Sequence, residues 1–467
     1  MKKITAIILA VVMLLCILPV SADESATDMS VEAGCNTVDG KMPLLGNQQL
    51  INNANAALLY ETTTDTLMYA HNADAKVPPS SLLKILTALI AIEKGSMTDV
   101  VTVRKEVLAT LPYDAAVVEL LVDEVVSVRD LLYCMMVSSG NDAAVVLADH
   151  VMGSQQAFVE EMNRRAAEYG CTGTHFVNVH GLHNENQYTT ARDVAKILKK
   201  AIENEEFCQL FGAKYYTVPE TNKWKERHLA SQNYLMNNDD MVIYYDERVT
   251  GSRTAIANDR TRSIASVAKV GDMQVICIVI GAKSQYTSDG YSERVYGGYN
   301  ETKQLLDLGF NGFKSVQLIH ENQVMLQNTV SGGSSDLSVG AMSAASSVIP
   351  ENIGADNLVY RYTNEVPLTL PIEKGQIVST LEVWCGNVCV AQTDLYAMNG
   401  VVSAATQFAD DNDNNGITVW QVIVYILLGV IAIVVVALLT LVVMRASQRA
   451  KAKRASRRNS RNRRRSR

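Results

Sequence analysis

The C-terminal region contains a long apolar run that restricts how this chain can fold. Residues 417–444 are predominantly apolar, and the core from Val422 to Val443 contains no charged side chain. As a helix at about 1.5 Å per residue, that core would extend roughly 33 Å, enough to cross a hydrocarbon layer of about 30 Å. The 23-residue tail that follows, residues 445–467, holds twelve Lys and Arg and no acid. We therefore expect a transmembrane helix at 417–444 and a cytoplasmic tail at 445–467.

A basic tail can also bind nucleic acid. Placed directly after a spanning helix, however, such a tail more often fixes the topology and contacts anionic lipid. We expect the membrane as a partner and no nucleic acid.

The N-terminus has the three parts of a secretory signal. Lys2 and Lys3 precede an apolar stretch from Ile4 to Val20, and the small residues before Asp23 predict cleavage after Ala22. A lipoprotein signal would lipidate Cys16, but the bulky Leu15 precedes it where a small residue is expected. A buried core helix is the other alternative, and the leading lysines disfavour it. We predict a signal peptide at residues 1–22.

The exported part of the chain is strongly acidic. The whole chain has a formal charge of −7, and without the twelve charges of the tail and the two lysines of the signal, residues 23–444 carry −21. The cysteines outside the signal are scattered and odd in number, so they form no disulfide framework. Cys385 and Cys389 could pair across a hairpin, and free buried thiols are expected for the others.

Composition divides the chain into two folded parts between polar linkers. Residues 23–50 and the acidic residues 401–416 lack the apolar content to order themselves, so both are predicted linkers. About 350 residues lie between them, more than one core usually serves, so we expect two domains. The predicted boundary near Phe310 to Phe313 gives domains at 51–312 and 313–400.

The first domain mixes helix and strand periodicities, which predicts an α+β fold. Residues 56–69 fit a strand, a turn at Thr63 to Asp65 and a returning strand, and residues 264–281 fit a hairpin that turns at Gly271 and Asp272. Helices are predicted at 82–92, 128–137 and 143–152. The second domain has short β-type runs broken by Gly and Pro, so we predict a small β domain in which Ser331 to Ser347 is a loop.

Ser81 and Lys84 form a Ser-x-x-Lys pair at a predicted helix start, where two prolines and a serine cap would begin the helix. A serine hydroxyl needs a nearby base, and a lysine desolvated by apolar neighbours can supply one. The helix N-terminus also favours the oxyanion of an acyl transfer. The pair alone has low specificity, because about two such matches are expected by chance in a chain of this length.

A second group of polar residues, Ser138 to Asp142, falls between two predicted helices. A tight turn there would project Ser139 and Asn141 into a cleft. The alternative reading is an ordinary helix start, with Asn141 or Asp142 as the N-cap.

These motifs, in this order, resemble the serine D-alanyl-D-alanine carboxypeptidases, the low-molecular-mass penicillin-binding proteins. The resemblance extends from about Ala56 to Ala282 and includes Gly181-Leu182-His183. It implies a β-lactamase/transpeptidase-like catalytic domain, an antiparallel sheet flanked by helices, and the segment around Pro371 to Gln376 is similar to the small β stalk that follows it in many members. The implied substrate is the D-alanyl-D-alanine end of peptidoglycan stem peptides, with β-lactams as inhibitors.

The resemblance also implies a role for each motif residue. Ser81 would attack the carbonyl of the penultimate D-alanine, Lys84 would accept its proton, and Ser139 would relay a proton to the leaving amine. Asn141 would bind the substrate amide. Water would then hydrolyse the ester on Ser81.

The third family motif, Lys-Thr-Gly, is altered in this chain. The ungapped alignment places Arg253-Thr254-Ala255 there, and a register on Val249-Thr250-Gly251 would keep the glycine but lose the cation. Arg253, with Thr254, would bind the terminal carboxylate, even bidentately. The Ala255 methyl could narrow the strand edge. The Ile256 N–H and the Ser81 N–H would form the oxyanion hole.

Other chemistries have less support. His180-x-x-His183 lacks a carboxylate partner motif and no CxxC pair with metal spacing occurs, so we expect no metal and no cofactor. A β-lactamase would need a deacylating Glu-x-x-Leu-Asn, which is absent between Asn141 and Thr250. The remaining alternative is a catalytically weakened homologue that acts as an anchored scaffold, and it is favoured only by the altered third motif.

Overall fold

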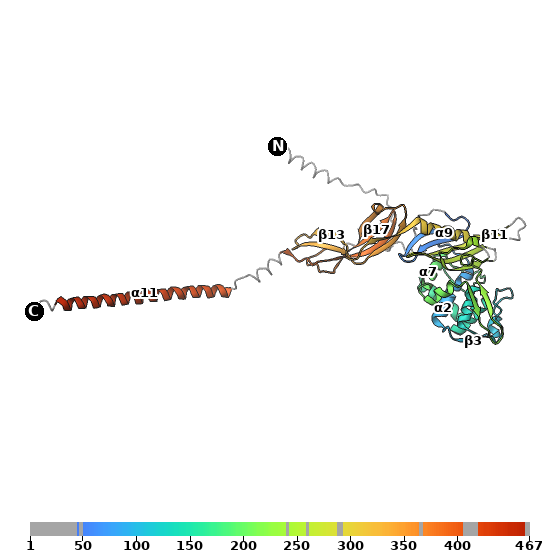
Figure 1. Cartoon of the computed structure of the whole chain (residues 1–467), viewed down its shortest axis with the longest axis horizontal. Coiled ribbons are helices and arrows are strands. Elements are labelled where there is room, and N and C mark those ends of the chain that lie inside the picture. The colour runs from blue at the N-terminus through green and yellow to red at the C-terminus, as the bar shows by residue number, and fades with distance from the viewer. Residues whose placement is uncertain are drawn as a thin grey trace, which may run out of the picture. The chain divides into compact units, whose positions relative to one another are not determined.

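The computed structural model describes residues 44–45, 50–239, 242–257, 261–286, 293–363, 368–404 and 419–462 of the chain (Figure 1). The predicted signal peptide, the Cys16 alternative and most of both predicted linkers lie outside these residues. Within the first linker, the described Leu44 and Leu45 donate backbone hydrogen bonds to Leu67 and Met68.

A five-stranded antiparallel sheet forms the centre of the first domain. Its strand order is β2-β1-β9-β8-β7, so β7 is an edge strand. The strands are β1 (Ala56–Glu61), β2 (Thr66–His71), β7 (Val249–Ile256), β8 (Thr261–Val270) and β9 (Met273–Lys283). The predicted strand pair at 56–69 and the predicted hairpin at 264–281 are confirmed.

Two hydrophobic clusters cover the two faces of this sheet. In β9, Ile276, Ile278 and Ile280 belong to one cluster, whereas Val275, Cys277 and Val279 belong to the other. Because side chains alternate along a strand, this division shows that the sheet is buried on both faces. Helix α9 (Tyr299–Gly312) covers one face, and α2 and α7 lie on the other (Figure 1).

The helices of the second face surround α2, whose residues Lys84 to Ile92 are all buried. An apolar helix without a polar face has to lie inside the fold, and this position carries Lys84 into the interior. The helices are α2 (Lys84–Lys94), α3 (Lys105–Leu108), α4 (Val128–Val137), α5 (Asn141–Met152), α6 (Gln155–Glu168), α7 (Ala191–Ala201) and α8 (Glu205–Phe211). Short elements complete this domain: η1 (Ser80–Leu83), η2 (Val242–Tyr244), β3 (Val100–Thr102), β4 (Val125–Ser127), β5 (Tyr215–Val218), β6 (Arg227–Ala230), β10 (Gln285–Tyr286) and β11 (Glu293–Val295).

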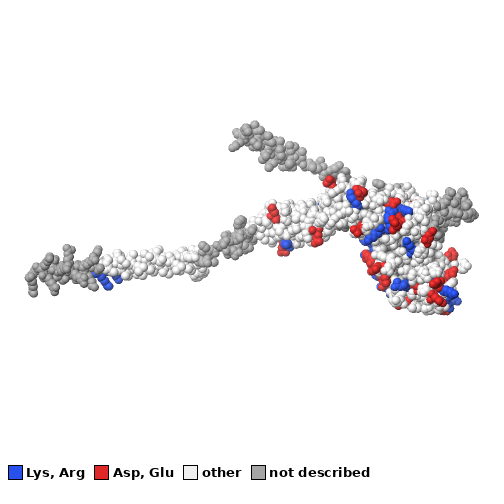
Figure 2. Space-filling model, in the orientation of Figure 1, with Lys and Arg blue, Asp and Glu red and all other residues white. Residues whose placement is uncertain are grey.

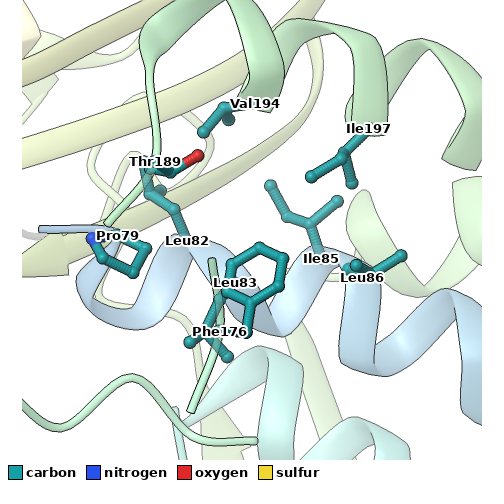
Figure 3. Close-up of a pocket in the computed structure, with 9 residues that line it drawn as sticks. All are labelled: Pro79, Leu82, Leu83, Ile85, Leu86, Phe176, Thr189, Val194 and Ile197. Atoms are coloured by element: carbon teal, nitrogen blue, oxygen red, sulfur yellow. The ribbon is translucent and has the colours of Figure 1, made fainter. Parts of the chain in front are cut away.

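The packing between α2 and α7 leaves a small apolar void. Figure 3 shows it, with Ile85 reaching from α2 toward Ile197 of α7 and Phe176 close to Leu83. Its lining is apolar apart from Thr189, so we interpret it as a packing gap in the core beside the start of α2.

The C-terminal β region consists of a two-stranded ribbon, β12-β15, and a sheet in the order β13-β14-β18-β17-β16. These strands are β12 (Phe313–Ile319), β13 (Val324–Thr329), β14 (Asp336–Ala341), β15 (Ala345–Pro350), β16 (Leu358–Thr363), β17 (Ile377–Cys385) and β18 (Val388–Ala397), with the short turn η3 (Ala355–Asn357). The predicted α+β fold with a following β domain is confirmed.

The prediction of a loop from Ser331 to Ser347 is wrong, because β14 and the start of β15 occupy this segment. Leu337, Val339 and Ala341 are buried at alternate positions, which is the period of a strand. The small residues of this segment resemble a linker in composition and conceal that period.

Three further sequence predictions need correction, two in this region and one at Cys208 of the first domain. Cys385 is free whereas Cys389 is disulfide-bonded, so the two do not pair with each other. Cys134, Cys171 and Cys277 form no disulfide and are buried, as expected, but Cys208 is exposed. Val401 is fully buried and pairs with Ile372, and Ser403 pairs with Gly333, so the ordered β region extends past the predicted boundary at residue 400.

Helix α11 (Val419–Asn462) contains the apolar run. The stretch long and apolar enough to span a membrane is Val422–Ser447. On the face that Figure 2 shows, this helix has no acidic or basic side chains before the basic ones near its C-terminal end. In the sequence, Arg445 lies near the end of the stretch and Arg449 just after it. The helix fits a membrane anchor.

Leu86 tests the packing that holds α2. It is fully buried and lines the void, so Leu86→Ala should lower the free energy of unfolding by about 2–5 kcal/mol, because it removes apolar contacts and enlarges a cavity. Denaturant unfolding of the detergent-solubilised chain measures this change. Leu121→Ala is the control, since Leu121 is 41% exposed and its loss should cost well under half as much. Equal losses at both positions would contradict the packing described here.

Candidate active site

Ser81 lies in the turn η1, immediately before α2. The turn is a short 3₁₀ segment that begins after Pro79, whose carbonyl accepts a hydrogen bond from the Leu82 N–H at 3.1 Å. No serine side chain caps this helix start, so the predicted serine cap is wrong. Ser80 has a φ of 45°, a left-handed conformation that non-glycine residues rarely adopt. Such local strain is typical of functional sites.

Lys84, one turn after Ser81, is completely buried and has three hydrogen-bond acceptors. Its Nζ lies 2.7 Å from Ser139 O, 2.7 Å from Asn141 Oδ1 and 3.1 Å from Ser139 Oγ. Burial holds the pKa of Lys84 well below its usual value, and the charge of Arg253 lowers it further, while Asp142 acts in the opposite direction. A lysine with a depressed pKa can act as a base near neutral pH.

Ser139 and Asn141 lie in the connection between α4 and α5, as the sequence predicts. Ser139 has a φ of 61°, and its Oγ lies 3.4 Å from Ser81 Oγ. The N-cap of α5 is Gly140, so neither Asn141 nor Asp142 has the capping role of the alternative reading. Instead, the buried Asp142 carboxylate accepts hydrogen bonds from the Val118 N–H and the Leu120 N–H.

Arg253 projects from β7 into the interior and is 4% exposed. Its Nη1 donates to the Met136 carbonyl at 2.6 Å and to the Met135 carbonyl at 3.3 Å. Its Nε donates to the Ser81 carbonyl at 3.3 Å, and its Nη2 donates to Ser139 Oγ at 2.8 Å. Burial lowers its pKa to about 10, so the group stays charged at neutral pH. These contacts use four of the five N–H groups of the guanidinium. Only one N–H group is left, so Arg253 cannot bind a substrate carboxylate through two parallel hydrogen bonds, as the sequence analysis expected.

The other residues of the third motif follow the alternation of a strand. Ala255 is 3% exposed and belongs to the same hydrophobic cluster as α2, so its methyl group does not narrow the strand edge as anticipated. Thr254 is half-buried and projects from the opposite face. Ile256 is exposed and reaches the cleft, whereas Arg253 and Thr254 are not among the side chains that line it.

The backbone of Ile256 points toward the free edge of the sheet. The Ala257 N–H bonds to the Thr261 carbonyl, and Ile256 faces Arg262 in the next pair of the ladder. Hydrogen-bonded and non-hydrogen-bonded pairs alternate in an antiparallel ladder, so the N–H and C=O of Ile256 point away from β8. Among the described residues, no strand pairs with this edge of β7, so its outward backbone groups are available next to η1.

A cleft of about 440 Å³ brings these parts together. Ser81, Ser139, Asn141 and Ile256 line it. The remaining lining comes from Ala257, which follows Ile256, and from three segments, around Pro79, around Ala116 and around Gly181 (Pro78, Pro79, Ser80, Asp114, Ala116, Gly181, Leu182, His183, Asn184, Gln187).

Gly181 allows this close assembly. It has a φ of 90°, and a Cβ there would lie 2.1 Å from the Ser80 carbonyl oxygen, so only glycine fits. The nearby His180 is buried, which together with Lys84 lowers its pKa to about 4, so it is neutral at neutral pH. Its Nδ1 accepts a hydrogen bond from the Leu182 N–H, and the described residues contain no group of three or more His, Cys, Asp or Glu that could hold a metal.

The segment from Asp114 to Leu120 is a part of the site that the sequence analysis missed. It is tied to the second motif by the Asn141 N–H, which donates to the Ala116 carbonyl at 2.9 Å, and by Asp142. It forms neither helix nor strand and has no apolar periodicity, so only the three-dimensional contacts reveal its role.

A buried lysine, two serines and an edge strand around one cleft are the arrangement that the sequence motifs predict for a serine hydrolase. A family model described as D-alanyl-D-alanine carboxypeptidase matches residues 46–284, and the model of the penicillin-binding protein 5 C-terminal domain matches residues 313–403. The chain is 32% identical to the D-alanyl-D-alanine carboxypeptidase DacC of Escherichia coli over 360 residues, which cover 74% of this chain and 84% of the relative. It is 28% identical to DacA of Haemophilus influenzae, over 75% of this chain and 86% of the relative.

The solved structures agree with the sequence comparisons. The crystal structure of penicillin-binding protein 5 from Haemophilus influenzae superposes with a TM-score of 0.61 at 27% identity, covering 77% of this chain and all of that one. The chain therefore belongs to the D-alanyl-D-alanine carboxypeptidase family of serine peptidases. The predicted resemblance, fold class and enzyme class are confirmed.

The charge of Arg253 should control the pH dependence of acylation. Arg253→Gln removes a positive charge beside Lys84, so the pKa of Lys84 should rise and less of the neutral amine should be present at neutral pH. Acylation by a fluorescent penicillin should fall at neutral pH, and its rise with pH should move to a higher pH. Arg253→Lys keeps the charge and should move the profile less. A profile of Arg253→Gln that coincides with the wild-type profile would contradict this role.

Proposed function

We propose that this protein is a membrane-anchored D-alanyl-D-alanine carboxypeptidase that removes the terminal D-alanine of peptidoglycan stem peptides through an acyl-enzyme on Ser81. The observation that supports it most directly is the chain of contacts from Ser81 Oγ through Ser139 Oγ to Lys84 Nζ inside the cleft. The names of the relatives point to the same reaction.

The acceptors around Lys84 suggest the route of the proton. A neutral amine has two N–H donors and one lone pair. Ser139 O and Asn141 Oδ1, which can only accept, take the two N–H groups at 2.7 Å each, and the lone pair then faces Ser139 Oγ. Ser139 Oγ accepts from Arg253 Nη2, and its O–H donates to Ser81 Oγ at 3.4 Å in the structure. When the Ser139 O–H turns to the lone pair of Lys84, Ser139 Oγ becomes able to accept the Ser81 O–H in its place.

In this arrangement the Ser81 proton passes to Ser139 Oγ as the Ser139 proton passes to Lys84. Ser81 Oγ forms the bond to the substrate carbonyl carbon, and the reverse transfer delivers a proton to the leaving amine of D-alanine as the C–N bond breaks. Water then hydrolyses the ester on Ser81. In this scheme Ser81, Lys84 and Ser139 are the catalytic residues.

Backbone and side-chain donors would hold the substrate. The Ser81 N–H lies at the start of a helical segment, where the first N–H groups have no helical partner, and the Ile256 N–H points to the free strand edge; together they would form the oxyanion hole. Asn141 Nδ2 has no acceptor among the described residues and would donate to the substrate amide. One N–H of Arg253 Nη2 remains for the terminal carboxylate. Thr254, on the other face of β7, would not contact that group, unlike the role expected from the sequence.

The scaffold alternative depends on the altered third motif. The altered residues are accommodated by the fold, because Arg253 contacts Ser139 and Ala255 packs in the hydrophobic core. Labelling by penicillin without release of D-alanine would favour the alternative.

We also propose that the catalytic domain lies outside the cell membrane and the tail inside. The apolar part of α11 is followed by the basic segment, and cytoplasmic flanks are enriched in Lys and Arg. The membrane and β-lactams complete the proposed partners, with neither nucleic acid nor a cofactor.

Substitutions of the proposed nucleophile and base test the mechanism. Ser81→Ala should abolish penicillin labelling and D-alanine release, and Lys84→Met should lower the acylation rate by about 10² to 10⁴, because the base is lost. Ser96→Ala, at an exposed serine outside the cleft, is the control and should act like the wild type. Labelling that persists in Ser81→Ala would place the nucleophile elsewhere.

Protease treatment of intact spheroplasts tests the topology. The protease should release the extracellular domains, while an epitope placed after Arg467 should stay attached to a small membrane-protected fragment, because the tail is inside. Digestion of that epitope without permeabilisation would overturn the orientation.

A further inference from the structure

The carboxylate of Asp142 is buried beside the second motif, and the reaction described above gives it no role. Asp142 is 2% exposed and directly follows Asn141 in the first turn of α5. Both of its oxygens lie 3.1 Å from the Val118 nitrogen, and Oδ2 also accepts from the Leu120 N–H at 2.9 Å. A buried carboxylate needs such donors, and here they come from a segment more than twenty residues earlier in the chain.

These hydrogen bonds hold one wall of the cleft. The wall segment, residues 114–120, forms neither helix nor strand, so no ladder or helical pattern satisfies its backbone. Ala116 lines the cleft, and its carbonyl accepts from the Asn141 N–H at 2.9 Å. Asp142 therefore supplies the acceptors that regular secondary structure would otherwise provide, and it joins the wall segment to α5.

Gly140 allows the wall segment to approach this closely. A Cβ at position 140 would lie 2.8 Å from Asp142 Oδ1 and 3.0 Å from Val118 Cγ1, so a side chain there would push the carboxylate and the wall segment apart. Ser139 precedes this glycine directly and Asn141 follows it. A displacement of the Asp142 carboxylate should therefore also move the two polar residues of the second motif.

Asp142 also acts on Lys84 through its charge. Lys84 is completely buried, and the positive charge of Arg253 from β7 lowers its pKa whereas the negative charge of Asp142 from α5 raises it. His180, from the connection between α6 and α7, is neutral because its pKa is lowered to about 4. Cys134 of α4 is an uncharged thiol, since burial raises its pKa to about 12. The charges of Arg253 and Asp142 thus oppose each other at the amine.

We propose that Asp142 is a positioning residue for the acylation of Ser81: its buried carboxylate holds the wall segment and the second motif together and offsets the charge of Arg253 at Lys84. The inference rests on the proposed function, in which Lys84 is the base. A base has to attract a proton as well as release it, so a base whose proton affinity is lowered by Arg253 alone would be a weaker one.

The pH profile of acylation tests both effects of Asp142. The full-length protein in detergent is labelled with a fluorescent penicillin, and rates are expressed per active site from end-point labelling. Asp142→Asn removes a negative charge, so the ammonium form of Lys84 becomes less favourable and its pKa should fall further. The rise of the acylation rate should move to a lower pH, opposite to the shift of Arg253→Gln. The double variant should have its midpoint between those of the two single variants.

The plateau of the same profile reports the geometry. The amide of Asp142→Asn turns a donor toward backbone N–H groups, so the wall segment should shift. The maximal acylation rate should fall about 10- to 100-fold, because a displacement of about 1 Å at a reacting site can cost on the order of 10²-fold. Midpoint and plateau are read within one variant and per active site, so partial unfolding does not change them.

Two further variants separate these effects from a loss of stability. Asp142→Glu keeps the charge and should keep the wild-type midpoint with a lowered plateau, and it tests the inference even if Asp142→Asn does not fold. Asp130→Asn is the matched control. Asp130 is 7% exposed, lies in the first turn of α4 and accepts from the Tyr216 O–H at 2.7 Å, but it is not among the charges that act on Lys84. This control should keep the wild-type midpoint and plateau.

The outcomes distinguish this inference from the proposed function. An Asp142→Asn profile with the wild-type midpoint or the wild-type plateau would overturn the role of Asp142 and leave the carboxypeptidase in place. An Asp142→Glu midpoint that falls as far as that of Asp142→Asn would do the same, as would an equal shift in Asp130→Asn. Absence of penicillin labelling in the wild type at every pH would overturn the proposed function itself.

Discussion

The burial of Lys84 is the constraint on which the site depends. An ammonium group in the interior is unfavourable unless it is compensated, and the chain supplies two acceptors that cannot donate, Ser139 O and Asn141 Oδ1. These contacts fix the connection between α4 and α5 against the start of α2. The position of the second motif is therefore set by the buried lysine of the first motif, which needs hydrogen-bond acceptors.

The edge strand β7 completes the site through two different properties. Its side chains alternate, so that Arg253 and Ala255 face the helices while Thr254 projects from the other face. Its backbone alternates as well, and Ile256 turns its N–H away from β8. A strand in the middle of the sheet could supply the first property but not the second.

The sequence predicted the parts of this arrangement that follow from local pattern. The helix with Lys84, the paired strands and the four residues Ser81, Lys84, Ser139 and Asn141 carry strong periodicity or ordered motifs. The prediction from sequence failed where a composition rich in small residues conceals the two-residue period of a strand, as in β14. It also failed where a role depends on contacts far apart in the chain.

Arg253 and the segment from Asp114 to Leu120 illustrate the second failure. The direction of the Arg253 side chain depends on carbonyl groups at the end of α4, more than a hundred residues earlier. The segment has no regular structure, and its place is set by Asn141 and Asp142. The Cys385–Cys389 pairing was wrong for a related reason, because neighbouring cysteines in a hairpin do not determine which thiols are oxidised.

The contacts of Arg253 also constrain how such a chain can diverge. Its guanidinium joins the end of α4, the turn before α2 and the second motif, and each contact uses a different part of its planar fork. A lysine has one compact ammonium group in place of this fork, so it would leave some of these buried carbonyl groups without donors. A change of Arg253 to lysine alone would therefore cost stability unless α4 also changed, so this position of the third motif depends on residues that no local motif contains.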